Sequence, residues 1–297
     1  MGELAALLTS GCWAFSAIIF TYAGRRVGAG AVNRLRLLFA LVFLIASHFL
    51  VRGTLLPLDA AWDRWMWLGL SGIAGLTLGD LALFQAYLYI GPRIGALIMA
   101  IVPVFSAILA WLFLGELLSW TQISGILLAV LGIAVVVMDH RGSKEGIAHN
   151  RRQYLLGIGL GFLAAIGQTT GLVLTKRGLE GGFPSISGVV IRVLVATLAI
   201  WAAALFSRQA RPTVNVLNNR ATFGLLLAGS LIGPFAGVWL STIAVQLTAV
   251  GVASTLTSLA PILLLPISGW LFHEKISARA VLGTLLTISG VVILFLL

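Results

Sequence analysis

Charged residues are scarce in this sequence: Asp, Glu, Lys and Arg make up only 9% of its 297 residues. A soluble protein needs about 25% charged residues to cover its surface, so an ordinary soluble domain is excluded. Hydrophobic residues make up 60% of the chain and occur in long runs. About 20 consecutive apolar residues are enough to cross a bilayer. The composition therefore predicts a polytopic membrane protein.

Cysteine is nearly absent as well, because Cys12 is the single example, and one cysteine cannot form an intramolecular disulfide. The four histidines form no metal-ligand motif and no hydrolytic constellation. No G-x-x-x-x-G-K-[ST] loop for nucleotide phosphates occurs either. We therefore expect no cofactor, no metal ion and no catalytic residues. The same absences argue against an enzyme and against transport driven directly by ATP.

The apolar runs predict an all-helical fold with ten transmembrane helices. Continuous runs indicate helices, because the strands of a membrane β-barrel alternate between apolar and polar residues. The first run lacks a basic n-region and a small-residue cleavage site, so we expect it to be retained. The expected spans are 3–22, 32–51, 66–89, 94–114, 120–138, 153–175, 185–206, 221–242, 248–272 and 278–297.

The formal net charge is +10, with 19 basic and 9 acidic residues. We expect no nucleic-acid partner, because basic residues of polytopic membrane proteins mostly lie in loops and orient the chain. Twelve basic residues follow odd-numbered spans and four lie in the opposite loops. The positive-inside rule then places the odd-numbered loops in the cytoplasm and both termini outside the cell. The predicted location is the inner or plasma membrane.

One apolar phrase is repeated along the chain. Residues 96–119 read ALIMAIVPVFSAILAWLFLGELLS, and residues 254–277 read STLTSLAPILLLPISGWLFHEKIS. Pro103 and Pro261 are 158 residues apart. Each proline should free a backbone carbonyl one turn earlier and bend its helix. We expect two kinked gating helices.

The repeat extends beyond this phrase. Residues 79–137 align with 237–295 at the same offset without a gap. Glu116 aligns with Glu274, and both are expected to cap helices or to pair in loops rather than to take part in transport.

The chain thus divides into a first five-helix half (1–140), a connecting polar loop (141–152) and a second five-helix half (153–297). An odd number of spans forces the second half to enter the membrane upside down. Inverted repeats let many secondary transporters alternate between two faces around one midplane site. The repeat therefore predicts a transporter that works by alternating access, with spans 3, 4, 8 and 9 lining its cavity.

Three features of the chain resemble the EamA-type carriers of the drug/metabolite transporter superfamily. The first is the repeat of two five-helix halves. The others are two motifs found in each half: Arg-x-x-x-Ala in the second helix (36–40 and 192–196), and Pro…Leu/Phe-x-Glu in the fourth helix. The most similar stretch is GDLALFQAYLYIGPRIGALIMAIVPVFSAILAWLFLGE, residues 79–116.

The resemblance implies an exporter of small metabolites, with amino acids, apolar or aromatic ones among them, as the leading substrate class. A nucleotide-sugar or phosphorylated-metabolite carrier is the alternative, and an intramembrane enzyme is less favoured. Protons are a candidate partner, facilitated diffusion is equally open, and we expect a monomer in the lipid bilayer. Many relatives are expected to keep both termini in the cytoplasm, opposite to the orientation that the charge count favours.

Asp80 lies well inside the third predicted span, where an ionised carboxylate is costly unless it pairs or meets water. Such an environment is also what a proton-carrying group requires. Asp80 is therefore a coupling residue, a structural partner of Arg36 or Arg192, or a residue near a hydrated end of the span. Its aligned residue is Val238, so the carboxylate occurs in one half only.

The other candidate residues are polar or soft side chains inside spans. Phe84 and Gln85 should continue the face of Asp80. Residues 254–261 offer hydroxyls at helical spacing, whereas the aligned residues 96–103 are apolar, a combination that suits a zwitterion with an apolar side chain. The alternative is that these hydroxyls bond across helices or to their own helix. The predicted substrate-binding residues are Trp13, Asp80, Phe84, Gln85, Met99, Pro103, Gln168, Trp239, Thr242, Ser254, Thr257, Ser258 and Pro261.

Overall fold

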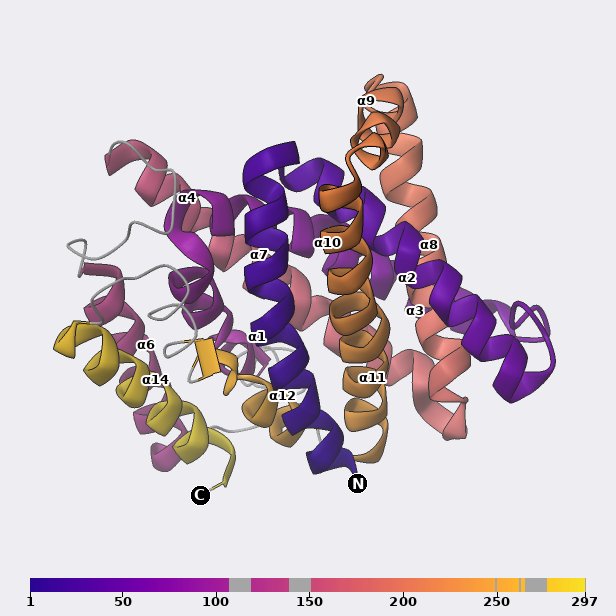
Figure 1. The fold of residues 1–297 in the computed structure, drawn as a ribbon. Helices are drawn as coiled ribbons and strands as arrows, with labels where there is room; N and C mark the ends of the chain where they lie inside the picture. The colour runs from indigo at the N-terminus through magenta and orange to yellow at the C-terminus, as the bar shows by residue number, and fades with distance from the viewer. Residues whose placement is uncertain (107–118, 139–150, 249, 262, 265–276, 297) are drawn as a thin grey trace.

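A computed structural model gives the fold (Figure 1). It describes residues 1–106, 119–138, 151–248, 250–261, 263–264 and 277–296. Every regular element within these ranges is a helix and none is a strand, so the all-helical prediction is confirmed. Glu116, Glu274 and nearly all of the predicted connecting loop lie outside the described residues.

The helices follow one another with short connections. In the first part of the chain they are α1 (Gly2–Val27), α2 (Ala29–Arg52), α3 (Trp62–Ser71), η1 (Gly72–Gly79), α4 (Asp80–Met99) and α6 (Trp120–Met138). In the second part they are α7 (Arg151–Leu179), η3 (Glu180–Gly182), α8 (Ser185–Phe206), α9 (Ala210–Asn215), η4 (Val216–Asn218), α10 (Arg220–Ser230), η5 (Leu231–Gly237), α11 (Val238–Leu247), α12 (Val250–Thr257) and α14 (Ala278–Leu296). The short α9 and η4 fill a loop for which no helix was expected.

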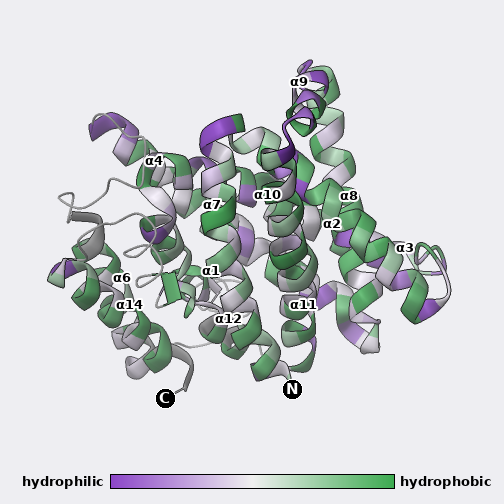
Figure 2. Ribbon diagram, viewed as in Figure 1, coloured by the Kyte–Doolittle hydropathy of each residue, from purple (hydrophilic) through white to green (hydrophobic). Residues whose placement is uncertain are grey.

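Long apolar helices dominate the described chain. Hydrophobic residues cover these helices, and hydrophilic residues gather at α9 and near helix ends (Figure 2). Within the described residues, six helices are long and apolar enough to cross a membrane: Gly2–Val27, Ala29–Arg52, Trp62–Met99, Arg151–Gly182, Ser185–Phe206 and Arg220–Leu247. The other predicted spans fall partly on shorter described helices, so the count of ten stays a prediction.

Gly91 interrupts the helix that runs from Trp62 to Met99. Its φ of 82° and ψ of 160° belong to a region that only glycine adopts readily, and Pro92 follows it. The interruption falls between the predicted third and fourth spans, whose separation stays a prediction. Arg93, one of the twelve cations assigned to odd-numbered loops, is only 6% exposed; without it the remaining loop charges still favour the same orientation.

The two parts of the chain are interleaved rather than side by side. Helix α1 packs against α10, η5, α11 and α12 of the second part, whereas α7 packs against α3, η1 and α4 of the first. Helix α2 packs against α8. Helix α6 packs against α14, and these two helices lie together at one side of the bundle (Figure 1). This exchange of partners places residues of both parts around one interior space.

Two π-helical segments occur at matching sequence positions. Segment η1 ends at Gly79 and η5 ends at Gly237, and these glycines align at the 158-residue offset. A π turn holds an extra residue, so it disturbs the regular backbone hydrogen bonding of the helix. Both segments border the interior space, where their carbonyl groups can accept hydrogen bonds from other helices.

The prolines that were predicted to kink two helices follow helix interruptions. Helix α4 stops at Met99, and a turn at 100–101 precedes the helical residues around Pro103. Helix α12 stops at Thr257, and a turn at 258–259 precedes Pro261. The two turns align at the same offset, as expected if each proline removes a backbone hydrogen bond one turn earlier.

Candidate functional site: a polar cavity inside the bundle

A cavity lies where the helices of both parts meet. The volume open to the centres of water molecules is about 100 Å³, enough for several waters or a small organic molecule. Its walls come from α1, α2, η1, α4, α7, α8, η5, α11 and α12, together with residues just beyond α4 and α12. The predicted third, fourth, eighth and ninth spans therefore line it, but helices of four further predicted spans do so as well.

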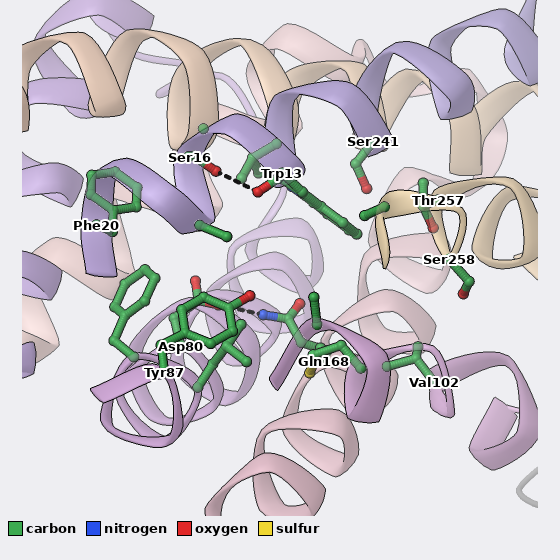
Figure 3. A pocket seen from close by; sticks show the side chains of 18 of the residues that line it. Trp13, Ser16, Phe20, Asp80, Tyr87, Val102, Gln168, Ser241, Thr257 and Ser258 are labelled. Carbon is green, nitrogen blue, oxygen red and sulfur yellow. Dashed lines mark hydrogen bonds between the residues drawn. The ribbon is translucent and has the colours of Figure 1, made fainter. Parts of the chain in front are cut away.

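A buried ion pair forms one side of the cavity. Arg36 of α2 donates to the carboxylate of Asp80 at the start of α4, and their side chains are 4% and 9% exposed. The Nε2 of Gln168, from α7, donates to Asp80 Oδ1 at 2.6 Å (Figure 3). A charged carboxylate can stay inside the bundle because a cation and an amide both face it.

Arg36 is held by a network that depends on the π segment η1. Its Nε donates to Asn33 Oδ1 at 2.9 Å. The amide of Asn33 in turn donates to the carbonyl oxygens of Leu76 and Thr77 at 3.2 and 3.1 Å, both within η1. The guanidinium also lies 4.7 Å from the ring centroid of Phe84, a favourable cation–π geometry. The orientation of Arg36 is therefore fixed from several sides.

A second buried arginine faces the same cavity with fewer partners. Arg192 of α8 is 3% exposed, and its Nη1 donates to Thr242 Oγ1 at 3.3 Å. Among the described residues its Nε has no hydrogen-bond partner and no carboxylate forms an ion pair with it. Among the described residues, the charged side chains that line the cavity are Arg36, Arg192 and Asp80. The cavity therefore carries an excess of one positive charge.

Hydroxyl groups lie at another end of the cavity, in Ser241, Thr257 and Ser258 (Figure 3). Thr257 Oγ1 and Ser258 Oγ donate to the carbonyl oxygen of Ser254 at 3.0 and 2.7 Å. The hydroxyl hydrogens are thus used within the helix, and the oxygens keep lone pairs for a donor in the cavity. The arrangement offers a cationic donor in one place and neutral acceptors in another.

The predicted binding residues divide into two groups by position. Those that line the cavity are Trp13, Asp80, Phe84, Met99, Gln168, Thr257, Ser258 and Pro261. Those that lie outside its lining are Gln85, Pro103, Trp239, Thr242 and Ser254. Binding of substrate by any of them stays a prediction.

The residues outside the lining have identifiable positions. Gln85 is five residues after Asp80, which is about 140° around a helix, so the face of Asp80 continues through Leu83, Phe84 and Tyr87 instead. Ser254 lies one turn before the cavity-lining hydroxyls and accepts their hydrogen bonds.

Trp239 packs against Phe235, with ring centroids 5.8 Å apart. Thr242 is fully buried next to Arg192. Pro103 is buried just beyond the Ala100 turn.

Several cavity residues are not among the predicted binding residues. Ser16 of α1 lies next to Trp13, and Phe20 lies farther along the same helix (Figure 3). Arg36 and Arg192 were expected as partners of Asp80. Both arginines are charged residues inside apolar spans, which usually marks a functional position. This signal could have identified them as candidate binding residues.

Comparisons with known proteins agree with this architecture. The chain is 27% identical, over 240 residues that are 76% of this chain and 72% of the relative, to a "Probable terminal-alkyne amino-acid exporter" of Streptantibioticus cattleyicolor. A solved structure described only as "Crystal structure of protein" superposes with a TM-score of 0.70 at 18% identity, over 99% of this chain and 96% of that chain, which shows the shared fold. A sequence model of the EamA-like transporter family matches residues 1–138 and 155–296. The chain therefore belongs to the EamA-like transporter family and is a multi-pass membrane protein that transports small molecules.

Proposed function

We propose that this transporter exports amino acids across the cell membrane, with large apolar or aromatic amino acids as the leading substrates. The observation that carries the proposal is the cavity, which combines Arg192, an arginine that forms no ion pair within the described residues, with hydroxyl acceptors and a wall of apolar and aromatic side chains. A zwitterion with an apolar side chain needs these three surfaces. The amino-acid exporter to which the chain is 27% identical supports the same substrate class.

Alternating access would use two inverted five-helix halves, 1–140 and 153–297, joined by the loop 141–152. Contacts between α6 and α14 support this division. The Cα of Gly132 lies against the backbone of Thr287, and that of Gly290 lies against the backbone of Ala129. Gly290 aligns with Gly132 and Thr287 aligns with Ala129. One contact is thus made twice with exchanged roles, as a two-fold axis requires.

The aligned helix interruptions before Pro103 and Pro261 are suitable hinges for this movement. Residues on both sides of each turn line the cavity. Bending at one turn would open the cavity towards one membrane face, and bending at the other would open it towards the opposite face. The helices that were predicted to be gates are therefore our candidates for the moving elements.

The transporter would act as a monomer, because one chain surrounds the whole cavity. Protons are the candidate coupling ion, since Asp80 is the buried acidic residue of the described chain. Proton exchange would require Asp80 to release Arg36 during the cycle. Facilitated diffusion, in which the pair stays intact, is the alternative energy source. Both termini would lie outside the cell, the orientation that the basic loops favour.

Efflux from proteoliposomes tests the proposal. Purified protein would be reconstituted in liposomes loaded with radiolabelled amino acids, nucleotide sugars or sugar phosphates. We expect saturable efflux of amino acids that speeds up when unlabelled amino acid is present outside, and recovery of the substrate chemically unchanged. Efflux of the phosphorylated compounds alone would favour the alternative carrier, and a chemically altered substrate would favour an enzyme.

A further inference from the structure

We infer that Arg192 binds the carboxylate of the transported molecule. This carboxylate would lie beside Arg192 as the carboxylate of Asp80 lies beside Arg36. The inference rests on the proposed function, because it assigns one end of the amino acid to one residue. It adds a requirement that the family membership does not contain: a substrate of this protein must carry a carboxylate.

The surroundings of Arg192 indicate an incomplete site. The side chain is 3% exposed and lines the cavity. A guanidinium has five N–H donors, yet the structure gives Arg192 one hydrogen bond, to Thr242, and leaves the buried Nε unpartnered among the described residues. Asp80 interacts with Arg192 electrostatically but forms its ion pair with Arg36, so no described carboxylate contacts the guanidinium of Arg192. A buried cation in this position is costly. An anion that enters the cavity would remove that cost.

The sequence repeat shows where such an anion would lie. Arg36 and Arg192 open the same Arg-x-x-x-Ala motif of their halves, and Arg36 is neutralised by Asp80. The residue that aligns with Asp80 is Val238, which also lines the cavity. The second half thus repeats the arginine but not the carboxylate. A substrate carboxylate beside Val238 would complete a second copy of the ion pair.

The local charges favour a carboxylate over a phosphate monoester. A carboxylate brings one negative charge to the guanidinium of Arg192, and the ammonium group of the same zwitterion would lie at the hydroxyl end of the cavity, whereas a dianionic phosphate would bring two negative charges to one guanidinium. The hydroxyls of Thr257 and Ser258 already donate to their own helix, so their free lone pairs suit an ammonium group and repel phosphate oxygens. Both ends of a zwitterion therefore find complementary groups.

Analogues of L-phenylalanine test the requirement for a carboxylate. L-phenylalaninamide keeps the ammonium group and the ring but lacks the carboxylate, whereas 3-phenylpropionate keeps the carboxylate and the ring. In proteoliposomes, the wild type should transport L-phenylalanine about ten- to 100-fold better than the amide, as expected for loss of a charge-assisted hydrogen bond. Transport should be inhibited by 3-phenylpropionate but not by phenyl phosphate.

The possible failures are distinguishable. If no amino acid is transported, the proposed function is wrong and the inference falls with it. If L-phenylalanine and its amide are transported equally well, the proposed function survives and the role of Arg192 is overturned. Inhibition by phenyl phosphate that exceeds inhibition by 3-phenylpropionate would mean that the excess charge serves a phosphate instead.

Variants of Arg192 separate binding from folding. Arg192→Met removes a buried charge that forms no ion pair among the described residues, so the unliganded variant should melt at the wild-type temperature or above. L-phenylalanine should raise the melting temperature of the wild type and not that of Arg192→Met. The matched substitution Arg36→Met should instead lower the melting temperature, because it strands Asp80. A ligand-induced shift that persists in Arg192→Met would overturn the inference.

A substitution at Val238 can supply the missing carboxylate from the protein itself. Val238→Asp should pair with Arg192, and uptake of L-phenylalanine should fall about tenfold or more below that of Val238→Asn, which has the same shape without the charge. Both variants must first be shown to be folded by their melting temperatures. Equal transport by the folded Asp and Asn variants would contradict a carboxylate position beside Val238.

Discussion

Arg36 and Arg192 occupy matching positions in the two halves of the repeat, yet their surroundings differ. Arg36 is held by Asp80 and Asn33 and lies against an aromatic ring. In the part of the chain that the structure describes, Arg192 has one hydrogen bond, to Thr242. A buried pair that loses one partner is strongly destabilised, so Arg36 serves the folded structure. Arg192 has fewer such contacts among the described residues, which would leave its guanidinium available to a ligand.

The same contrast extends to the whole cavity. The backbone irregularities are repeated, because η1 matches η5 and the turn at 100–101 matches the turn at 258–259. The side chains at these places are not repeated, since Ala100 aligns with Ser258. A repeated backbone suits a movement that must run in both directions. Different side chains suit a substrate whose two ends differ chemically.

The largest effect expected from this comparison is on stability, in the variant Asp80→Asn. It leaves Arg36 buried without its counter-charge, which should cost about 3–5 kcal/mol in the free energy of unfolding. Chemical unfolding in detergent, followed by tryptophan fluorescence, measures this loss. The double variant Asp80→Asn/Arg36→Met should recover much of it.

The corresponding variant in the other half, Arg192→Met, should show no such loss. Wild-type stability of Asp80→Asn would contradict a structural ion pair. Asp80→Asn also tests proton coupling. If Asp80 carries the proton, proton-driven flux should disappear in this variant while exchange of substrate continues. An unchanged response of a folded variant to a pH gradient would assign Asp80 to structure alone.

The Arg36–Asp80 pair could be predicted only in part from the sequence. A carboxylate inside an apolar span needs a cation, so the sequence alone identifies Arg36 and Arg192 as its two candidate partners. The choice between them could not be predicted, because it depends on the π segment η1, whose carbonyls position Asn33 beside Arg36. Hydropathy does not encode a π turn or a hydrogen bond between distant helices.

Elements with local causes were predicted more accurately. Gly91 and the residues before Pro103 and Pro261 interrupt helices where expected, since glycine and proline act on their own backbone. Side-chain placement around the cavity was less accurate, and Gln85 lies off the cavity face because five residues do not return to the same side of a helix. The cavity itself depends on the packing of α1 against α11 and of α7 against α4, which no local pattern contains.

The next largest effect is a block of transport by a large side chain in the cavity. Ser258 lines the cavity and is 8% exposed, so Ser258→Trp should fill the substrate space. Uptake should fall at least about 100-fold, equivalent to about 2.7 kcal/mol, while the folded yield stays near that of the wild type. The aligned variant Ala100→Trp should block transport as well, because Ala100 also lines the cavity.

The matched control for these two variants is Leu127→Trp in α6, where the side chain is 59% exposed and should tolerate a larger one. A poorly folded Ser258→Trp would instead indicate a packed helix interface, since overpacking costs about 1–3 kcal/mol. A folded and fully active Ser258→Trp would remove the second-half hydroxyls from the substrate path.

A smaller and symmetrical effect is expected where α6 packs against α14. A Cβ atom on Gly132 would collide with the backbone of Thr287, and one on Gly290 would collide with the backbone of Ala129. Gly132→Ala and Gly290→Ala should each lower the free energy of unfolding by roughly 1–3 kcal/mol, and by similar amounts if a two-fold axis relates them. Gly159→Ala in α7 meets nothing within 4 Å and should be tolerated. Clearly unequal losses would contradict the two-fold arrangement.

The smallest effect concerns the single hydrogen bond of Arg192. Thr242→Val keeps the shape of the side chain but removes the oxygen that accepts from Arg192 Nη1 at 3.3 Å. Hydrogen bonds between membrane helices contribute about 0.6 kcal/mol on average, so we expect the KM for an amino acid to rise about threefold at an unchanged maximal rate. Stability should hardly change, because Thr242 otherwise donates only to Val238 on its own helix.

The matched control for Thr242→Val is Thr197→Val, which makes the same chemical change on α8, the helix that carries Arg192. Thr197 donates to the carbonyl of Val193 at 2.6 Å and is not part of the cavity lining, so its loss should leave KM unchanged. If both variants raise KM equally, a general loosening of α8 and α11 explains the effect. If only Thr242→Val raises it, and the rise disappears for L-phenylalaninamide, then the hydroxyl acts by orienting the guanidinium towards the carboxylate.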